Sequence, residues 1–198
     1  MVSFQKYARQ IVLLHQESIL SWKKSDVFFK EQGFFRLVEE NHAFNYLLWH
    51  AEDKARRDDM GFEFVYRAKR AIDEYNQQRN NRMETMDEWL FKALDAPPST
   101  HCCVHSETPG MMIDRLSILA LKSYHMALQS TRKDVDSAHL QASSAKWQRI
   151  EEQKKQLEDC LHQLLQEVTH KTRTFRIYHQ FKMYNDPSLN PELYQRKR

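Results

Sequence analysis

Glycine and proline are scarce in this chain, with only 3 Gly and 5 Pro among 198 residues. Because these residues make turns and end helices, their scarcity excludes a fold of many short strands and tight turns. Apolar residues make up 41% and charged residues 29%, which suits a globular chain long enough to bury a core. We therefore expect an all-α fold, an antiparallel bundle of about five long helices. It should form a single helical domain over residues 1–184 with a tail over residues 185–198.

Long apolar runs are also missing. No run approaches the roughly 18 residues of a membrane helix. The opening "MVSFQKYARQIVLLHQ" has a short apolar run and no small-residue cleavage site, so we expect no signal peptide. The 3 cysteines do not form a disulfide framework, and reduced thiols in the cytoplasm are the simplest interpretation.

The chain lacks a strong excess of charge of one sign. Its net charge is only +3, and Lys and Arg are mixed with Asp and Glu along most of its length. A nucleic-acid-binding protein usually shows a clustered basic face. The charge pattern therefore argues against a nucleic-acid partner.

Periodicity and capping signals divide the chain into its helices. Thr108 followed by Pro109 is the strongest start signal, a cap and then proline at the first helical position. Ser3 is the predicted cap of the first helix, and Asp58 or Asp59 that of the third. The predicted helices cover residues 3–24, 34–57, 58–94, 108–130 and 136–184, with 108–130 central. We expect no strand.

The last predicted helix carries a heptad-like apolar seam. A helix over residues 136–184 would be about 70 Å long, whereas a compact chain of this size has a radius of gyration of about 16 Å. We therefore expect it to break near Ser143 and Ser144 or to project from the body. Because the seam exceeds what one small body covers, we predict a homodimer that buries part of residues 140–182.

Polar residues occupy positions where packing is expected. The segment "MMIDRLSILALKSYHM", residues 111–126, is apolar on almost every side yet contains two adjacent charges and a central lysine. Helices 34–57 and 58–94 also place charged and amide groups on or beside their apolar stripes. The candidate cluster consists of Asn45, Trp49, Glu52, Asp53, Arg56, Asp73, Asn76, Arg79, Asn80, Asp114, Arg115 and Lys122.

Two interpretations of this cluster remain open. Buried charges need partners, so the cluster could be a structural network that fixes helix register. The pairs expected are Glu52 with Arg56, Asp114 with Arg79, and Arg115 with Asp53. Alternatively, Arg, Asn and Asp together suit the hydroxyls and phosphates of an anionic or sugar-like ligand. In both cases Asp114, Arg115 and Glu52 should be mostly buried.

Two arrangements could suggest a metal, but we expect none. The loop segment "HCCVH" contains His101, Cys102, Cys103 and His105, whose spacing matches no standard zinc finger. A pair of E-x-x-H motifs, Glu39 with His42 and Glu167 with His170, matches part of a di-iron site. Such pairs arise easily by chance in a chain rich in Glu and His. No phosphate-binding glycine loop or catalytic motif is present.

Three blocks of sequence resemble a bacterial family of unknown function. They are "NYLLWHAEDKARR", "IDEYNQQRNN" and "TPGMMIDRLSILALKSYHM", and the resemblance spans roughly residues 34–130. The positions that match its pattern are Pro109 and Ser117 together with all the residues of the candidate cluster. Asn81 departs from it, since the family has an acidic residue there. Membership would imply an all-helical protein of about this length.

The resemblance also implies a cellular context, because genes of this family lie near genes for cell-envelope polysaccharide and glycosyltransferases. We therefore expect a non-catalytic accessory or ligand-binding protein linked to cell-envelope polysaccharide assembly. The alternative is an enzyme that acts on a phosphosugar or nucleotide-sugar through the Asp/Asn/Arg cluster. The residues identify no cofactor. A raised carboxyl pKa in an open cleft would favour the enzyme.

Overall fold

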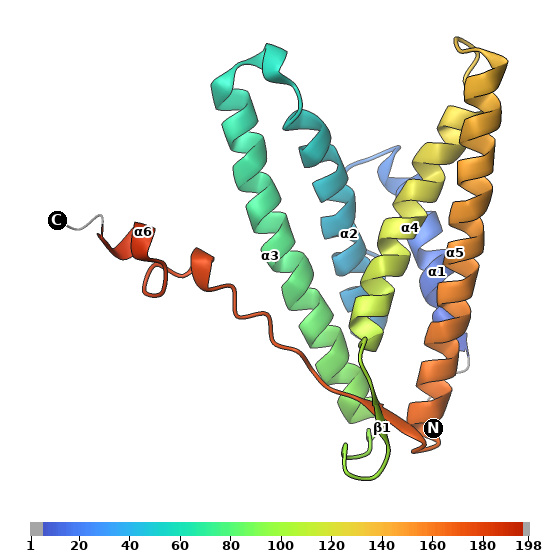
Figure 1. Ribbon diagram of the computed structural model, residues 1–198, viewed down its shortest axis with the longest axis vertical. Helices are drawn as coiled ribbons and strands as arrows, with labels where there is room; N and C mark the ends of the chain where they lie inside the picture. The colour runs from blue at the N-terminus through green and yellow to red at the C-terminus, as the bar shows by residue number, and fades with distance from the viewer. Residues whose placement is uncertain (1–5, 196–198) are drawn as a thin grey trace.

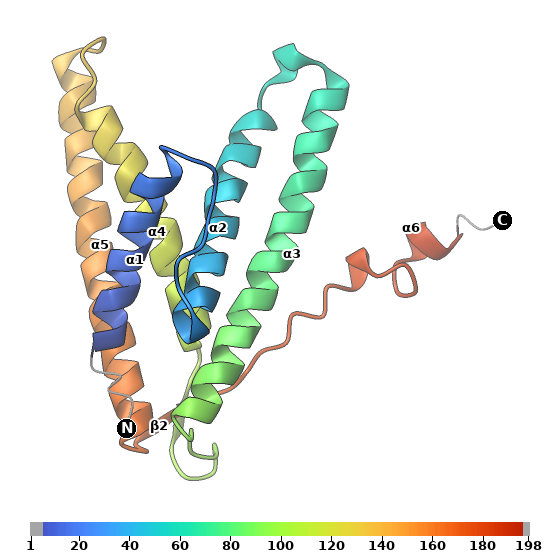
Figure 2. The ribbon, with the colours of Figure 1, turned by 180° about the vertical axis from the view of Figure 1, so that it is seen from behind.

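The fold is all-α, as predicted. In the computed structural model, which describes residues 6–195, five long helices form the body: α1 (Tyr7–Trp22), α2 (Gly33–Lys54), α3 (Phe62–Ala93), α4 (Pro109–Ser130) and α5 (Ser137–Thr169). Helices α2 and α3 form one antiparallel hairpin, and α4 and α5 form another (Figure 1). The two hairpins meet at one end and diverge at the other, so the body is V-shaped. Helix α1 lies over α4 between them (Figure 2).

The main apolar core lies at the closed end of the V. It joins the start of α2, the end of α3, the start of α4 and the end of α5, through residues such as Val38, Met86, Ile113 and Leu161. Helix α4 packs against α1, α2, α3 and α5, which confirms its predicted central place. Its apolar residues on many sides are needed because neighbours surround it.

The start of α4 follows the sequence prediction. The Thr108 side chain caps the helix by accepting the Met111 N–H at 3.2 Å, and Pro109 follows at the first helical position. Gly110 is required because α3 passes close by: a Cβ added there would lie 2.6 Å from the Met83 carbonyl oxygen. Each residue of the "TPG" motif thus has its own physical role.

The predicted cap of the third helix was wrong. Asp58 and Asp59 do not cap α3, because they form a short 3-10 helix, η2 (Asp58–Met60). Gly61, with φ of 84°, then turns the chain into α3. The predicted cap Ser3 lies outside the described residues.

The last helix ends earlier than predicted, at Thr169 instead of Tyr184. Lys171 adopts φ of 63°, a left-handed conformation that stops the helix. The next residues form a strand, β2 (Arg173–Phe175), parallel to β1 (Cys103–His105), so the expectation of no strand was wrong. Burial of Phe175 against Phe91 fixes this change of conformation.

Beyond β2 the chain leaves the body. It contains η3 (Met183–Asn185) and the single turn α6 (Pro191–Tyr194), and its end extends away from the helices in both views (Figures 1 and 2). Residues 176–185, which we name the strap, cross the end of α3 and contact it at Glu84 and Gln77.

Helix α5 continues through Ser143 and Ser144 without the predicted break. Its seam residues Leu161, Leu164 and Val168 are buried in the core of their own chain, where α5 packs against α4 and α1. The seam therefore gives no argument for a dimer, and the homodimer stays a prediction.

Candidate functional site

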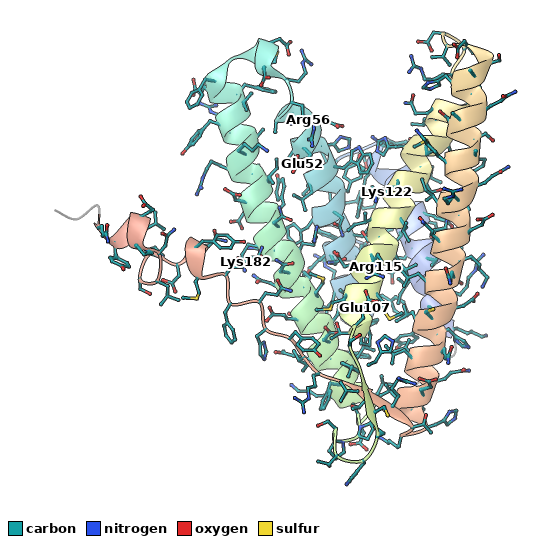
Figure 3. The ribbon with its side chains drawn as sticks, viewed as in Figure 1. Glu52, Arg56, Glu107, Arg115, Lys122 and Lys182 are labelled. Carbon is teal, nitrogen blue, oxygen red and sulfur yellow. The ribbon has the colours of Figure 1, made fainter. Side chains whose placement is uncertain are left out.

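A cleft lies between the α2–α3 hairpin and α4. Its lower part is a cavity of about 600 Å³ between α3, α4 and the strap. Its upper part is a cavity of about 380 Å³ between α2, α3 and α4. Asn76, Arg79 and Ile118 line both, so the two cavities adjoin. In Figure 3, Glu52 and Arg56 mark the α2 side of the opening and Arg115 lies on α4.

The floor of the cleft is a buried polar network centred on Asp114. Asn41 and Asn45, on successive turns of α2, donate side-chain N–H groups to Asp114 Oδ1 at 3.1 and 2.8 Å. Arg79 Nε on α3 lies 3.3 Å from the same oxygen, an ion pair whose angle is not that of a hydrogen bond. Three helices therefore share one carboxylate, and the predicted pair of Asp114 with Arg79 is confirmed.

The network continues into the core through Ser117. Its hydroxyl oxygen accepts the Asn45 side-chain N–H at 3.0 Å and lies 2.7 Å from His42 Nδ1. The His42 ring lies 4.5 Å from that of His15, centroid to centroid, and both histidines are fully buried. Burial lowers the pKa of His42 to about 3, partly offset by the His15 backbone, and lowers that of His15 well below its usual value. Both rings are therefore neutral and belong to the core.

The prediction that Arg115 is buried was wrong. Its side chain is 57% exposed and pairs with Glu107, just before α4, and not with Asp53. Glu52 is also only partly buried, and it pairs with Arg56 one turn later, as predicted. Asp114 alone of the three is buried as expected. The charges of the cluster thus divide into a buried floor and exposed walls.

The structure brings most of the predicted cluster to this cleft. The upper cavity is lined by Asn45, Trp49, Glu52, Asp53, Arg56, Asn76 and Arg79. The lower cavity adds Asp73, Asn80, Asp114 and Arg115. Lys122 lies elsewhere, in a hollow of about 500 Å³ between α4 and α5 that Arg115 also borders. The Trp49 ring stacks on His125, with centroids 4.5 Å apart and the planes 5° from parallel.

Two amide groups on α3 are free to bind a ligand. Asn76 and Asn80 make no side-chain hydrogen bond with any residue of the described range 6–195, yet both line the lower cavity. Asn80 is only 7% exposed. Its amide atoms are not fully buried, so water or a ligand in the cavity can meet them.

The metal motifs have other roles in the structure. Glu39 accepts the backbone N–H groups of Lys30 and Glu31 at 3.0–3.1 Å, and Glu167 pairs with Arg173 at 2.5 Å. Cys103 and His105 lie in β1. Within residues 6–195 no three His, Cys, Asp or Glu side chains are placed to hold a metal ion.

Sequence reasoning missed several residues of the site. Asn41 and His42 carry the network on α2, and the strap contributes Gln180, Lys182, Tyr184 and Asn185 to the lower cavity. Asn41 could have been found, because it lies one turn before Asn45 on the same face. The strap gives no such local signal, since its position depends on where α5 ends.

Comparison with known proteins identifies the family but no function. A search of curated proteins and a search of solved structures found no match. Within the described residues no helix has the length and apolar character to cross a membrane. Residues 35–177 match a family described as a protein of unknown function, DUF4254, which reaches beyond the three resembling blocks through α5 and β2. This match covers more than half of the sequence, and the chain belongs to that family.

Proposed function

We propose that this chain is a non-catalytic protein that binds a phosphosugar or nucleotide-sugar in the cleft between its two hairpins. The observation that carries the proposal is Asn80, a nearly buried amide that lines the lower cavity without a partner among the described residues. The Asn80 amide is not fully buried, so a ligand in the cavity can reach it. A ligand hydroxyl can accept from its N–H and donate to its oxygen.

The other groups on the cleft walls suit the same ligand. On α3, Asp73 lies three residues before Asn76, and Asn76 lies four residues before Asn80. The three side chains therefore lie along one helix face. Arg115 lies across the cavity on α4. Amides and carboxylates at helical spacing, opposite a guanidinium, can bind neighbouring hydroxyls and a phosphate.

The placement of the carboxyl groups favours binding over catalysis. Asp114 already accepts two amide N–H groups and lies against Arg79, so its Oδ1 is occupied. The carboxyl whose pKa is clearly raised is Asp87, and it lines neither part of the cleft. An enzyme acting on the same substrate class is the alternative. The proposed role in cell-envelope polysaccharide assembly rests on the family resemblance described above.

The test is calorimetric titration and thermal melting of the whole protein with glucose, glucose 1-phosphate, UDP-glucose and UDP-N-acetylglucosamine. We expect at least one probe to bind and raise the melting temperature. Asn80→Ala should weaken that binding about three- to tenfold, the loss of one hydrogen bond. Asn81→Ala is the matched control, because Asn81 follows Asn80 on α3 but is exposed and bonds Gln77.

Two results would overturn the proposal. The first is that no probe shifts the melting temperature of the wild type. The second is that Asn80→Ala and Asn81→Ala bind as tightly as the wild type. NMR of the recovered probe separates binding from catalysis, since a non-catalytic protein returns it unchanged.

A further inference from the structure

The strap forms one wall of the lower cavity. After β2 the chain crosses α3, and the cavity is lined on this side by Gln180, Lys182, Tyr184 and Asn185, together with residues of α3 and α4. Figure 3 shows Lys182 on this segment, beside α3. The cavity is therefore built from three parts of the sequence, and the strap is its last component.

Lys182 differs from the other cations of the cavity in having no counter-charge. Arg79 pairs with Asp114, and Arg115 pairs with Glu107. Asp73, on the cavity edge, pairs with Arg70 at 3.4 Å. Lys182 makes no ion pair with any residue in the described range, and it is partly buried. The cavity thus presents one uncompensated positive charge.

We propose that Lys182 binds the phosphate of the ligand, and that the strap is part of the binding site. This inference rests on the proposed function and specifies the chemistry of its ligand. A lysine ammonium acts as a compact charge with three donors, which suits a phosphate oxygen. Asn76 and Asn80 then lie across the cavity to bind the sugar hydroxyls.

The strap is held to α3 by few and exposed contacts. Glu84 accepts the Gln180 backbone N–H at 2.7 Å and lies 3.1 Å from His179 Nδ1. Asn185 donates to the Gln77 side-chain oxygen at 3.1 Å. Phe181 is 84% exposed, so the strap buries little apolar surface. Segments with this character open locally at low cost, and such opening would admit the ligand.

The experiment compares three full-length proteins: wild type, Lys182→Met and Lys69→Met. Lys69 is an exposed lysine of α3 outside both parts of the cleft, so its substitution removes the same charge. Calorimetry uses glucose 1-phosphate, glucose and inorganic phosphate. We expect Lys182→Met to weaken glucose 1-phosphate binding at least tenfold and to leave glucose unchanged. Lys69→Met should change neither.

Hydrogen exchange provides a second measurement. Glucose 1-phosphate should slow exchange of the Gln180 amide in the wild type and have little effect on it in Lys182→Met. Equal affinity of the wild type and Lys182→Met for glucose 1-phosphate would overturn the role of Lys182. If Asn80→Ala still weakened that binding, the proposed function would stand. Inorganic phosphate binding as tightly as glucose 1-phosphate, and through Lys182, would support this inference and contradict the sugar part of the proposed function.

Discussion

The backbone N–H of Gly110 donates to the Asp87 carboxyl group at 2.6 Å, which joins the first turn of α4 to α3. A carboxyl group at a helix N-terminus satisfies a free N–H and complements the helix dipole. This contact, at the closed end of the V, fixes the start of the central helix. From this contact, the two helices that line the lower cavity, α3 and α4, diverge.

Gly110→Ala should strongly destabilise the protein. The new methyl group would lie 2.6 Å from the Met83 carbonyl oxygen and 2.8 Å from Asp87 Oδ1, so the two helices must separate. We expect a loss of about 2–4 kcal/mol of unfolding free energy, measured by urea denaturation. Gly61→Ala is the comparison, since its Cβ meets nothing within 4 Å and only its φ of 84° opposes it. That variant should lose about 1 kcal/mol, and a larger loss there would contradict our account.

Asp87 should make stability fall as the pH rises. Burial raises its pKa to about 7, although hydrogen bonds from Thr108 and Gly110 oppose the shift. Because the folded pKa exceeds the unfolded value of 3.8, this stabilisation is complete below pH 3.8 and is lost as the pH rises through 7. Between pH 3.8 and 7, the unfolding free energy of the wild type should fall, relative to that of Asp87→Asn, by up to about 1.4 kcal/mol per pH unit. Parallel pH curves for the two proteins would contradict the prediction.

His42 should have the opposite effect at acid pH. The pKa of His42 in the folded protein, about 3, lies below its ordinary value of 6.5, so the unfolded chain takes up the proton first as the pH falls. The stability contribution is present above pH 6.5 and is lost as the pH falls toward 3. NMR titration of the folded protein should show the His42 ring still neutral at pH 5. A titration midpoint near 6.5 would show that His42 is not buried as described.

Asp114 and Arg115, adjacent in sequence, should differ in their effect on stability. Asp114→Ala removes the shared acceptor of Asn41 and Asn45 and leaves Arg79 unpaired, at a cost of about 3 kcal/mol. Arg115→Met breaks an exposed pair with Glu107 and should cost less than about 1 kcal/mol. Thermal and urea unfolding of both variants measure these two losses of stability. A larger loss for Arg115→Met than for Asp114→Ala would be inconsistent with a buried floor and an exposed wall.

The sequence by itself determined the helices and their starting signals. Helical periodicity and caps depend on residues three or four apart, so the all-α class, the Thr108 cap of α4 and the start of α5 near residue 136 could be read locally. The predicted cap of α3 at Asp58 or Asp59 was wrong. The pairs of Glu52 with Arg56 and of Asp114 with Arg79 were also predicted.

Only the tertiary structure decided which charges are buried and where the last helix ends. Arg115 follows Asp114 on a helix apolar on almost every side, and its exposure depends on the divergence of the two hairpins, which no local pattern encodes. The apolar pattern continues past Thr169, but Phe175 is buried by leaving the helix and packing on Phe91, far away in sequence. The helix therefore ends at Thr169 because long-range packing overrides local helical preference, and the strap begins where β2 ends.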